Sequence, residues 1–109
     1  MPVSTAAEER LDDVFHALAD RTRRAILARL ARGPASIGDI AEPFAMSLPA
    51  VSKHVRVLER AGLVVRHVDG RVHECSLGAA PLGEVQEWLA RYRVFWNATL
   101  DAFAEFVER

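Results

Sequence analysis

The sequence has little of what marks a disulfide-rich, membrane-spanning or low-complexity protein. It contains one cysteine in 109 residues, so no intrachain disulfide can form, which fits a reducing compartment. The longest stretch without a charged residue runs only from Pro43 to Ser52, about half of the ~20 residues that a transmembrane helix needs. No basic and then apolar leader opens the chain, so we expect no signal peptide. The 6 glycines and 5 prolines are scattered, which excludes collagen-like and low-complexity structure.

The sequence does contain enough apolar residues for one folded domain. Hydrophobic residues make up 50% of the chain and charged residues 27%. A chain of this length forms one domain and buries roughly two thirds of the surface that it exposes when unfolded. We therefore expect a single soluble, cytoplasmic domain over residues 1–109.

The net charge of −1 conceals an uneven distribution of charge along the chain. Residues 1–20 carry −4 and residues 74–109 carry −3, whereas residues 21–46 and 47–73 each carry +3. A basic centre between acidic ends is expected of a nucleic-acid-binding region with flanks that do not bind. Solvated helix faces also produce such runs, so the charge pattern by itself leaves both interpretations open.

Apolar spacing and capping residues predict four helices in the first part of the chain. Leu11, Val14, Phe15 and Leu18 follow the i, i+3, i+4, i+7 spacing of an amphipathic helix. Asp20, Ser36 and Ser47 stand where the N-caps of the next three helices are expected. Gly33 and Gly62 stand where the second and fourth helices should end. The four helices are expected over residues 7–19, from Asp20 to Arg32, from Ser36 to Pro43, and from Ser47 to Ala61.

A hairpin and one long helix are predicted to follow. Two runs rich in β-branched residues, Leu63–Val68 and Val72–Leu77, flank Asp69-Gly70, which indicates a two-residue hairpin turn. A single helix over about residues 81–107 is then expected, because apolar residues recur at alternating steps of three and four. That heptad series consists of Leu82, Val85, Leu89, Tyr92, Trp96, Thr99, Phe103 and Phe106.

The predicted fourth helix has one apolar and one basic face. On a helical wheel Leu48, Val51, Val55 and Leu58 fall on one side and should face the core. The opposite side is small near its start and cationic further on, as a helix that enters a DNA major groove requires. The third and fourth helices would then form a helix-turn-helix over about residues 36–61. An ordinary basic surface helix is the alternative. The outward residues are Pro49, Ser52, Lys53, Arg56 and Arg60, with His54 at the flank.

The hairpin adds weight to the DNA-binding interpretation. Arg71 lies at its expected tip, and Arg66 and His67 lie on its first strand, next to the basic helix. A cationic β-wing at about residues 63–77 would reach the neighbouring DNA backbone or minor groove. A helix-turn-helix followed at once by a basic hairpin is more specific than either part, and it predicts a mostly α-helical winged helix-turn-helix fold.

The stretch from His16 to Leu77 resembles the ArsR-type winged-helix repressors of bacteria. The resemblance rests on LADRTRRAIL (Leu18–Leu27), SLPAVSKHVRVLERAGLV (Ser47–Val64) and DGR at the hairpin tip. It implies a homodimer that binds double-stranded DNA at a palindromic operator, in the bacterial cytoplasm and at the nucleoid when bound. It also implies Arg71 as the wing contact, and the basic first strand of the hairpin adds Arg66 as an expected DNA contact. In the fourth helix the implied DNA contacts are Ser47, Pro49, Ala50, Ser52, Lys53, His54 and Arg56.

The metal sites of this family do not carry over to this sequence. Metal-sensing members commonly place a Cys-x-Cys motif near the third helix, but residues 36–44 hold no cysteine or histidine, and there is no histidine from Pro81 onward. Across a hairpin with an Asp69-Gly70 turn, His67 would point to the face opposite His73, so the two would not share an ion. Cys75 is expected to be a packed strand residue rather than a sensor. We therefore expect no metal and no cofactor, and the sequence leaves a small-molecule effector open.

The last helix carries more aromatic residues than a small core can cover. Six of the eight aromatic residues of the chain lie on it. Exposing this seam would invite aggregation, whereas pairing with a second copy would bury it in a two-fold interface together with the helix at residues 7–19. Aromatics that only cap the monomer core would explain the start of the helix but not its end. The expected interface residues are Leu11, Phe15, Trp88, Tyr92, Phe95, Trp96, Thr99, Phe103 and Phe106.

The expected function is a dimeric transcriptional repressor that blocks a promoter without a metal effector. One alternative keeps the fold and adds metal or redox sensing, for example by Cys75 with a histidine across the dimer. A second alternative is a winged helix that binds only proteins. His54 has two interpretations, a phosphate donor, which we prefer, or a polar neighbour of the core. An enzyme is not expected, because no catalytic triad, phosphate-binding glycine loop or pair of inward carboxylates can be assembled.

Overall fold

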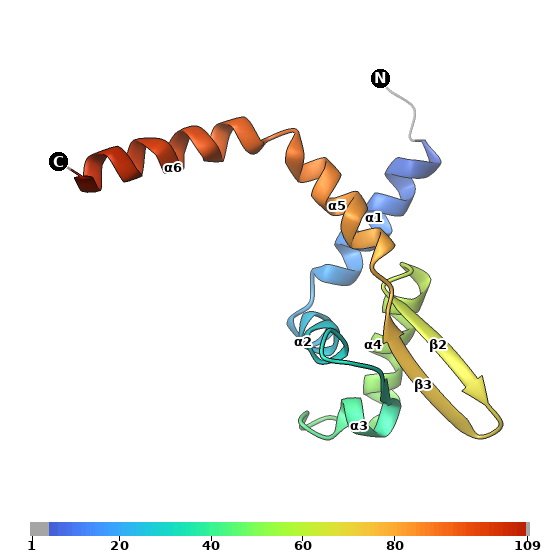
Figure 1. The fold of residues 1–109 in the computed structure, drawn as a ribbon. Helices are drawn as coiled ribbons and strands as arrows, with labels where there is room; N and C mark the ends of the chain where they lie inside the picture. The colour runs from blue at the N-terminus through green and yellow to red at the C-terminus, as the bar shows by residue number, and fades with distance from the viewer. Residues whose placement is uncertain (1–4, 109) are drawn as a thin grey trace.

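Six helices and a small antiparallel sheet make up residues 5–108, the part of the chain that the computed structural model describes. Figure 1 shows α3 and the hairpin tip at one end of the body, with α1 and α5 at the other end. This architecture confirms the mostly α-helical winged helix-turn-helix fold. The helices are α1 (Ala6–Leu18), α2 (Arg21–Leu30), α3 (Ile37–Ala41), α4 (Leu48–Arg60), α5 (Ala80–Ala90) and α6 (Arg93–Glu108). The strands are β1 (Ala35–Ser36), β2 (Val64–Asp69) and β3 (Val72–Leu77).

The predicted N-caps begin α2, α3 and α4, whereas α2 and α3 end earlier than expected, at Leu30 and Ala41. Asp20, Ser36 and Ser47 are the N-caps of α2, α3 and α4. Each side-chain oxygen accepts a hydrogen bond from the backbone N–H three residues later, at 3.1 to 3.3 Å. Gly62 follows the C-cap of α4 with φ 78°, a left-handed conformation that glycine adopts without strain. These caps determine where α4 starts and stops.

The inner face of α4 forms the centre of the core. Val51, Val55 and Leu58 are fully buried, in one cluster with apolar residues of α1, α2, α3 and the sheet. Leu48 was expected on this face, but 53% of it is exposed. The helical wheel was wrong there because Leu48 lies in the first turn of α4, at the end of the helix that stands outside the core.

The sheet has three strands in the order β1-β3-β2, where the sequence predicted two. β1 has only two residues, too few to show an alternating pattern, and pairs with β3. The predicted Asp69-Gly70 turn was wrong, because Asp69 pairs with Val72 and the turn is Gly70-Arg71. A type I′ turn at Asp69-Gly70 would need a positive φ at Asp69 as well as at Gly70. Gly70 has φ 61°, but no non-glycine residue in the described part of the chain has a positive φ, so that turn does not form.

In the observed register, the two hairpin histidines still lie on opposite faces, as the sequence predicted. Val68 pairs with His73, so these two side chains lie on the same face of the hairpin. His67 is one residue before Val68 and therefore lies on the opposite face, because side chains alternate along a strand. The expectation that His67 and His73 point to opposite faces is confirmed, although the turn that led to it was wrong.

The single helix expected over residues 81–107 is two helices. The backbone N–H groups of Arg91 and Tyr92 bind carbonyls three residues back, at 3.3 and 2.9 Å, instead of four. This tighter hydrogen bonding ends α5, and α6 then takes a new direction. Figure 1 shows α6 leading away from the body, and with α6 included the molecule is 59 Å along its longest axis. No helix within residues 5–108 is both long enough and apolar enough to span a membrane.

Candidate nucleic-acid interface

The outer face of α4 presents small residues at its start and cations further along. Pro49, Lys53 and Arg56 are exposed, and Ala50 and Ser52 are half-buried. Within residues 5–108, neither Lys53 nor Arg56 forms an ion pair, and the guanidinium of Arg56 makes only a long 3.5 Å contact with a backbone carbonyl. The basic side chains predicted on this helix therefore stand free of the body.

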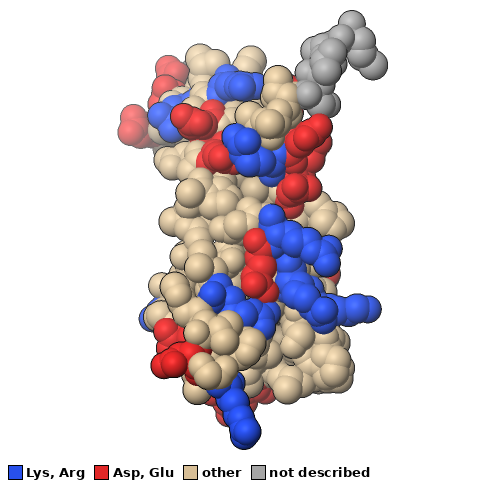
Figure 2. All heavy atoms as spheres, turned by 90° about the vertical axis from the view of Figure 1, so that its right-hand side faces the viewer, with Lys and Arg blue, Asp and Glu red and all other residues tan. Residues whose placement is uncertain are grey.

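The hairpin tip adds a cation to the same side of the molecule. Arg71 lies in the turn between β2 and β3 and is exposed. Figure 2 shows basic side chains gathered midway down the face that α4 and the hairpin form, with a further one projecting at its lower end. The structure thus exposes the tip residue as the winged-helix prediction requires.

Arg66 does not lie free with Arg71. Its Nη2 donates a hydrogen bond to Glu59 Oε1 of α4 at 2.6 Å, and its Nη1 lies 3.2 Å from His73 Nδ1 of β3. Only 21% of the Arg66 side chain and 29% of the Glu59 side chain are exposed. The guanidinium therefore joins the hairpin to α4, and this geometry does not support the expected DNA contact by Arg66.

Three arginines of the basic segment 21–46 donate hydrogen bonds to backbone carbonyls, two of them at the end of α1 and one in the loop after α2. Arg23 Nε donates to Ala17 O at 2.7 Å, and Arg24 Nη1 donates to Leu18 O at 2.6 Å. Arg29 Nη1 donates to the carbonyl of Gly33 at 3.1 Å. The charge count of this segment overstates its contribution to DNA binding. The sequence positions of Arg23 and Arg24 could have indicated this role, because arginines just after an N-cap lie next to the free carbonyls of the preceding helix.

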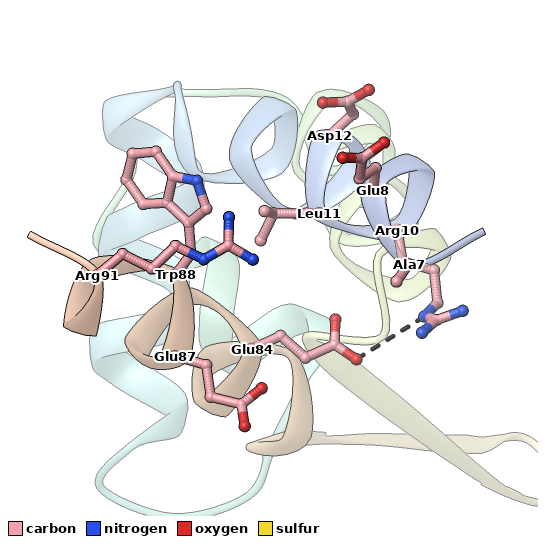
Figure 3. A pocket seen from close by; sticks show the side chains of 9 residues that line it. All are labelled: Ala7, Glu8, Arg10, Leu11, Asp12, Glu84, Glu87, Trp88 and Arg91. Carbon is pink, nitrogen blue, oxygen red and sulfur yellow. Dashed lines mark ion pairs between the residues drawn. The ribbon is translucent and has the colours of Figure 1, made fainter. Parts of the chain in front are cut away.

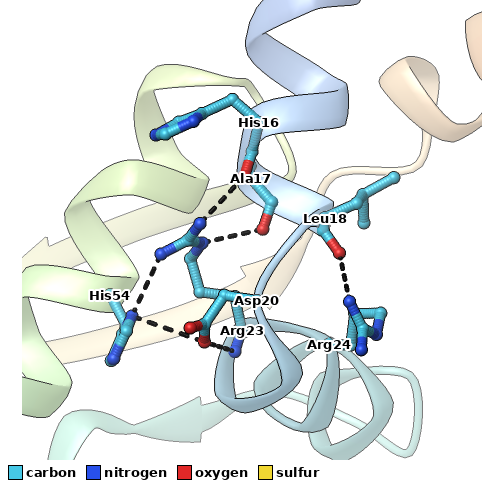
Figure 4. Close-up of polar contacts among 7 residues, drawn as sticks. All are labelled: His16, Ala17, Leu18, Asp20, Arg23, Arg24 and His54. Carbon is cyan, nitrogen blue, oxygen red and sulfur yellow. Dashed lines mark hydrogen bonds and ion pairs between the residues drawn. The ribbon is translucent and has the colours of Figure 1, made fainter.

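His54 lies among polar groups of α2 (Figure 4). Its Nδ1 is 3.4 Å from Arg23 Nη1 and 3.9 Å from Asp20 Oδ2, and its side chain is 20% exposed. The backbone hydrogen bond from Arg23 is the main cause that lowers the pKa of Asp20, and the nearby charge of the Arg23 guanidinium acts in the same direction. This geometry favours the second interpretation of His54, a polar neighbour of the core.

The residues expected at a dimer interface fall into two groups. The first group surrounds α1 and α5, where the rings of Phe15 and Trp88 meet edge-to-face with centroids 5.2 Å apart. The rings of Trp88 and Tyr92 lie 5.0 Å apart. Beside them an open hollow of about 740 Å³ between α1 and α5 contains the Arg10–Glu84 ion pair, 3.7 Å long (Figure 3). Leu11 also lines this hollow.

The second group lies on α6 and is exposed. None of the described residues of α6 is buried. Phe95, Phe103 and Phe106 are between 65% and 70% exposed, and Trp96 is 38% exposed. The Thr99 hydroxyl donates to a carbonyl of its own helix at 2.9 Å. The body of this chain therefore leaves the aromatic side chains of α6 uncovered.

The cysteine and histidines of the hairpin do not converge. Cys75 is fully buried in the core, and its burial raises the pKa of the thiol. His67 and His73 lie on opposite faces of the hairpin. Within the described residues, no group of three or more His, Cys, Asp or Glu side chains could hold a metal ion.

Comparison with known proteins identifies the same architecture elsewhere. A family model described as a helix-turn-helix domain matches residues 18–67. The HTH-type transcriptional regulator Rv2034 of Mycobacterium tuberculosis is 38% identical over 97 residues, which are 89% of this chain and 88% of that protein. The transcriptional repressor SdpR of Bacillus subtilis is 35% identical over 82 residues, which are 75% of this chain and 91% of that protein.

Solved structures extend the similarity to the whole fold. The crystal structure of an ArsR family transcriptional regulator is 45% identical with a TM-score of 0.76, and the match covers 82% of this chain and 92% of that one. A more distant structure is the homodimeric winged helix-turn-helix DNA-binding domain from Mycobacterium bovis. It is 24% identical with a TM-score of 0.63 over 94% of this chain and 95% of that one, and so shares the fold.

Proposed function

This chain belongs to the ArsR family of winged helix-turn-helix transcriptional regulators, and we propose that it is a dimeric repressor that binds an inverted-repeat operator without a metal effector. It is a DNA-binding transcriptional regulator and not an enzyme. A relative that is 35% identical is named a transcriptional repressor, which supports repression over activation. Because the target is promoter DNA, we place its action at the bacterial nucleoid.

The observation that carries this proposal is the free basic face of α4. Lys53 and Arg56 point away from a helix whose other face is buried, so they are available to phosphates and base edges. The small residues of the first turns allow that end of α4 to approach the floor of a major groove, where the helix dipole favours phosphate. The proposed contacts on α4 are Ser47, Pro49, Ala50, Ser52, Lys53 and Arg56.

The hairpin tip supplies the second proposed contact with DNA. Arg71 is exposed in the turn of the wing, and no ion pair holds it within residues 5–108. A cation at that place reaches the sugar–phosphate backbone or the minor groove beside the α4 site. We leave Arg66 and His54 out of the contact set, because their side chains are engaged with Glu59 and Arg23.

We propose a second copy of the chain as the partner that covers α6. Its aromatic residues are exposed and follow α5 in the chain, where Trp88 meets Phe15 of α1 edge-to-face, and an uncovered apolar surface of this kind marks an interaction site. A two-fold interface buries the same patch on both copies. The M. bovis domain with this fold is a homodimer. Two-fold symmetry places two α4 helices one DNA turn apart, or a multiple of it, which is the reason for an inverted-repeat operator.

The state of Cys75 supports regulation without thiol chemistry. A buried thiol with a raised pKa carries little thiolate, which is the form that binds metals and attacks oxidants. We therefore expect zinc or mild oxidation to change operator affinity by no more than about twofold, or ~0.4 kcal/mol. A larger change under either treatment would favour the sensor alternative.

Replacing the cations of α4 tests the DNA-binding proposal. Lys53→Ala or Arg56→Ala should each weaken operator binding by about 1–3 kcal/mol, measured by fluorescence anisotropy, and leave the dimer intact. Arg10→Ala is the matched control, because Arg10 is an exposed cation on α1 that pairs with Glu84 of α5 and lies outside the proposed DNA contacts (Figure 3). Unchanged binding by the Lys53/Arg56 double variant would contradict α4 as the recognition helix.

Selecting duplexes from a random pool tests the operator. Binding sites recovered with the wild-type protein should be palindromic, with half-sites one helical turn or a multiple apart. Their affinity should fall steeply with salt, because phosphate contacts release counterions. Sites without a two-fold pattern would contradict the dimer. If the protein shows no salt-dependent binding to any duplex, the alternative of a protein-binding module is favoured.

A further inference from the structure

Arg23 joins three helices through one side chain (Figure 4). From α2 its Nε donates to Ala17 O at 2.7 Å and its Nη2 donates to His16 O at 2.9 Å, and both carbonyls belong to the last turn of α1. Its Nη1 lies 3.4 Å from His54 Nδ1 on α4. A guanidinium only donates hydrogen bonds, so Nδ1 of His54 is the acceptor in this contact.

The two helices that Arg23 connects have different proposed roles. α1 carries Leu11 and Phe15, which belong to the expected dimer interface, and α4 carries Lys53 and Arg56, which are proposed DNA contacts. Only Ala19 and Asp20 separate α1 from α2 in the chain. His54 is the residue after Lys53, so the α4 end of this connection adjoins a proposed DNA contact.

We propose that Arg23 and His54 are positioning residues that fix the orientation of α4 relative to α1, and that they thereby determine which half-site spacing the dimer accepts. This inference depends on the proposed dimeric DNA-binding function. Apolar burial also joins the two helices, since Val14 and Val55 belong to the same buried cluster. Burial is not directional, however, whereas a side chain bonded to two helices restricts their rotation.

Half-site spacing is a sensitive measure of that orientation. Each base pair added between half-sites moves the second one by about 3.4 Å along the duplex and turns it by about 35° around the axis. A dimer with rigidly oriented α4 helices should accept one spacing and reject its neighbours. A dimer whose α4 can rotate against α1 should bind neighbouring spacings more nearly alike, and its recognition of each half-site should be unchanged.

The test compares two adjacent arginines on a series of operators. The duplexes contain the selected half-sites at the preferred spacing and at spacings one and two base pairs longer or shorter. Arg23→Gln is compared with Arg24→Gln, which is the matched control because Arg24 also donates to the end of α1, at Leu18 O, and makes no hydrogen bond to α4 in the described structure. Measuring Tm and sedimentation of each variant shows whether it folds and dimerises.

We expect Arg23→Gln to lower the ratio of affinities between the preferred and neighbouring spacings by about two- to tenfold, the range of one hydrogen bond. Arg24→Gln should leave that ratio as in the wild type. Base preference within a half-site should stay the same for both variants.

Variants at His54 keep the proposal testable if Arg23→Gln fails to fold. His54→Leu fills similar space but has no acceptor, so it should also flatten the spacing preference. His54→Asn places an oxygen the same number of bonds from the backbone as Nδ1, so it should restore most of the preference.

Three results would overturn the proposal. One is a spacing preference that Arg23→Gln and His54→Leu leave unchanged. Another is a uniform loss of affinity at every spacing, since it would show that Arg23 and His54 contribute to the stability of the fold and not to the orientation of α4. The third is an effect of Arg24→Gln equal to that of Arg23→Gln. Wild-type protein that binds no duplex at any spacing contradicts the proposed function itself, and with it this inference.

Discussion

Replacing Arg66 with glutamine should loosen the hairpin from α4 without changing the number of DNA phosphates that the protein neutralises. The Arg66–Glu59 pair joins β2 to α4 with a 2.6 Å hydrogen bond, and both side chains are largely covered. Exposed ion pairs contribute about 0.2–1 kcal/mol, and hydrogen bonds to charged groups about 1.5–3 kcal/mol. We expect this partly covered pair to lie between the two, so its loss should lower the free energy of unfolding by about 1–2 kcal/mol.

A double-mutant cycle in urea isolates this interaction. The cycle uses Arg66→Gln, Glu59→Gln and the combined variant, and the free energy of unfolding is measured for each. If the two side chains act on each other, the combined variant should be less destabilised than the sum of the single variants, by about 1 kcal/mol. Strictly additive losses would mean that each residue acts alone.

The salt dependence of operator binding then separates the two roles of Arg66. A residue that neutralises one phosphate adds about 0.9 to the slope of log affinity against log salt. Arg71→Gln, at the exposed tip of the same hairpin, should therefore lower that slope by about 0.9. Arg66→Gln should weaken binding about equally at every salt concentration. A slope lowered by about 0.9 for Arg66→Gln would refute this reasoning and return Arg66 to the DNA contacts.

Three further predictions follow from packing, charge and exposure. Gly78→Ala should lower the free energy of unfolding by about 1–3 kcal/mol in urea, because a Cβ there would overlap the Gly62 carbonyl oxygen, whereas Gly83→Ala, where a Cβ meets open space within a helix, should raise it. Asp20→Asn should lose stability relative to the wild type above pH 3.8, the ordinary pKa, and the difference should disappear as pH falls through the lower folded-state value; a pH-independent difference would contradict the charge effect. Phe103→Glu should give folded monomers in sedimentation velocity, because the side chain is 65% exposed in one protomer, and an intact dimer would contradict the α6 interface.

The sequence predicted the local structure of the winged helix well. The N-caps Asp20, Ser36 and Ser47, and Gly62 after α4, act through bonds and dihedral angles within a few residues, so they can be read without knowing the fold. The hairpin and the buried face of α4 follow from residue spacing in the same way. The candidate recognition helix was predictable for that reason, and its identification did not require the tertiary structure.

The partners of the arginines were not predictable in this way. Arg66 was expected on DNA but binds Glu59, and Arg23, which entered only the charge count of residues 21–46, binds α1 and approaches His54, which lies 31 residues away. A charged side chain has the same appearance in a sequence whether it faces solvent, a carboxylate or a helix end. Which of these it meets depends on how the helices pack.

The end of the chain shows the same division between local and tertiary information. The sequence determined that an apolar, aromatic segment follows the hairpin, because the spacing of its residues is written in the chain. It did not reveal the break at Arg91–Tyr92, where no glycine or proline stands. Only the three-dimensional arrangement decided which of these side chains pack on α1 and which stay uncovered on α6, since burial depends on neighbours from distant parts of the chain and not on the order of residues.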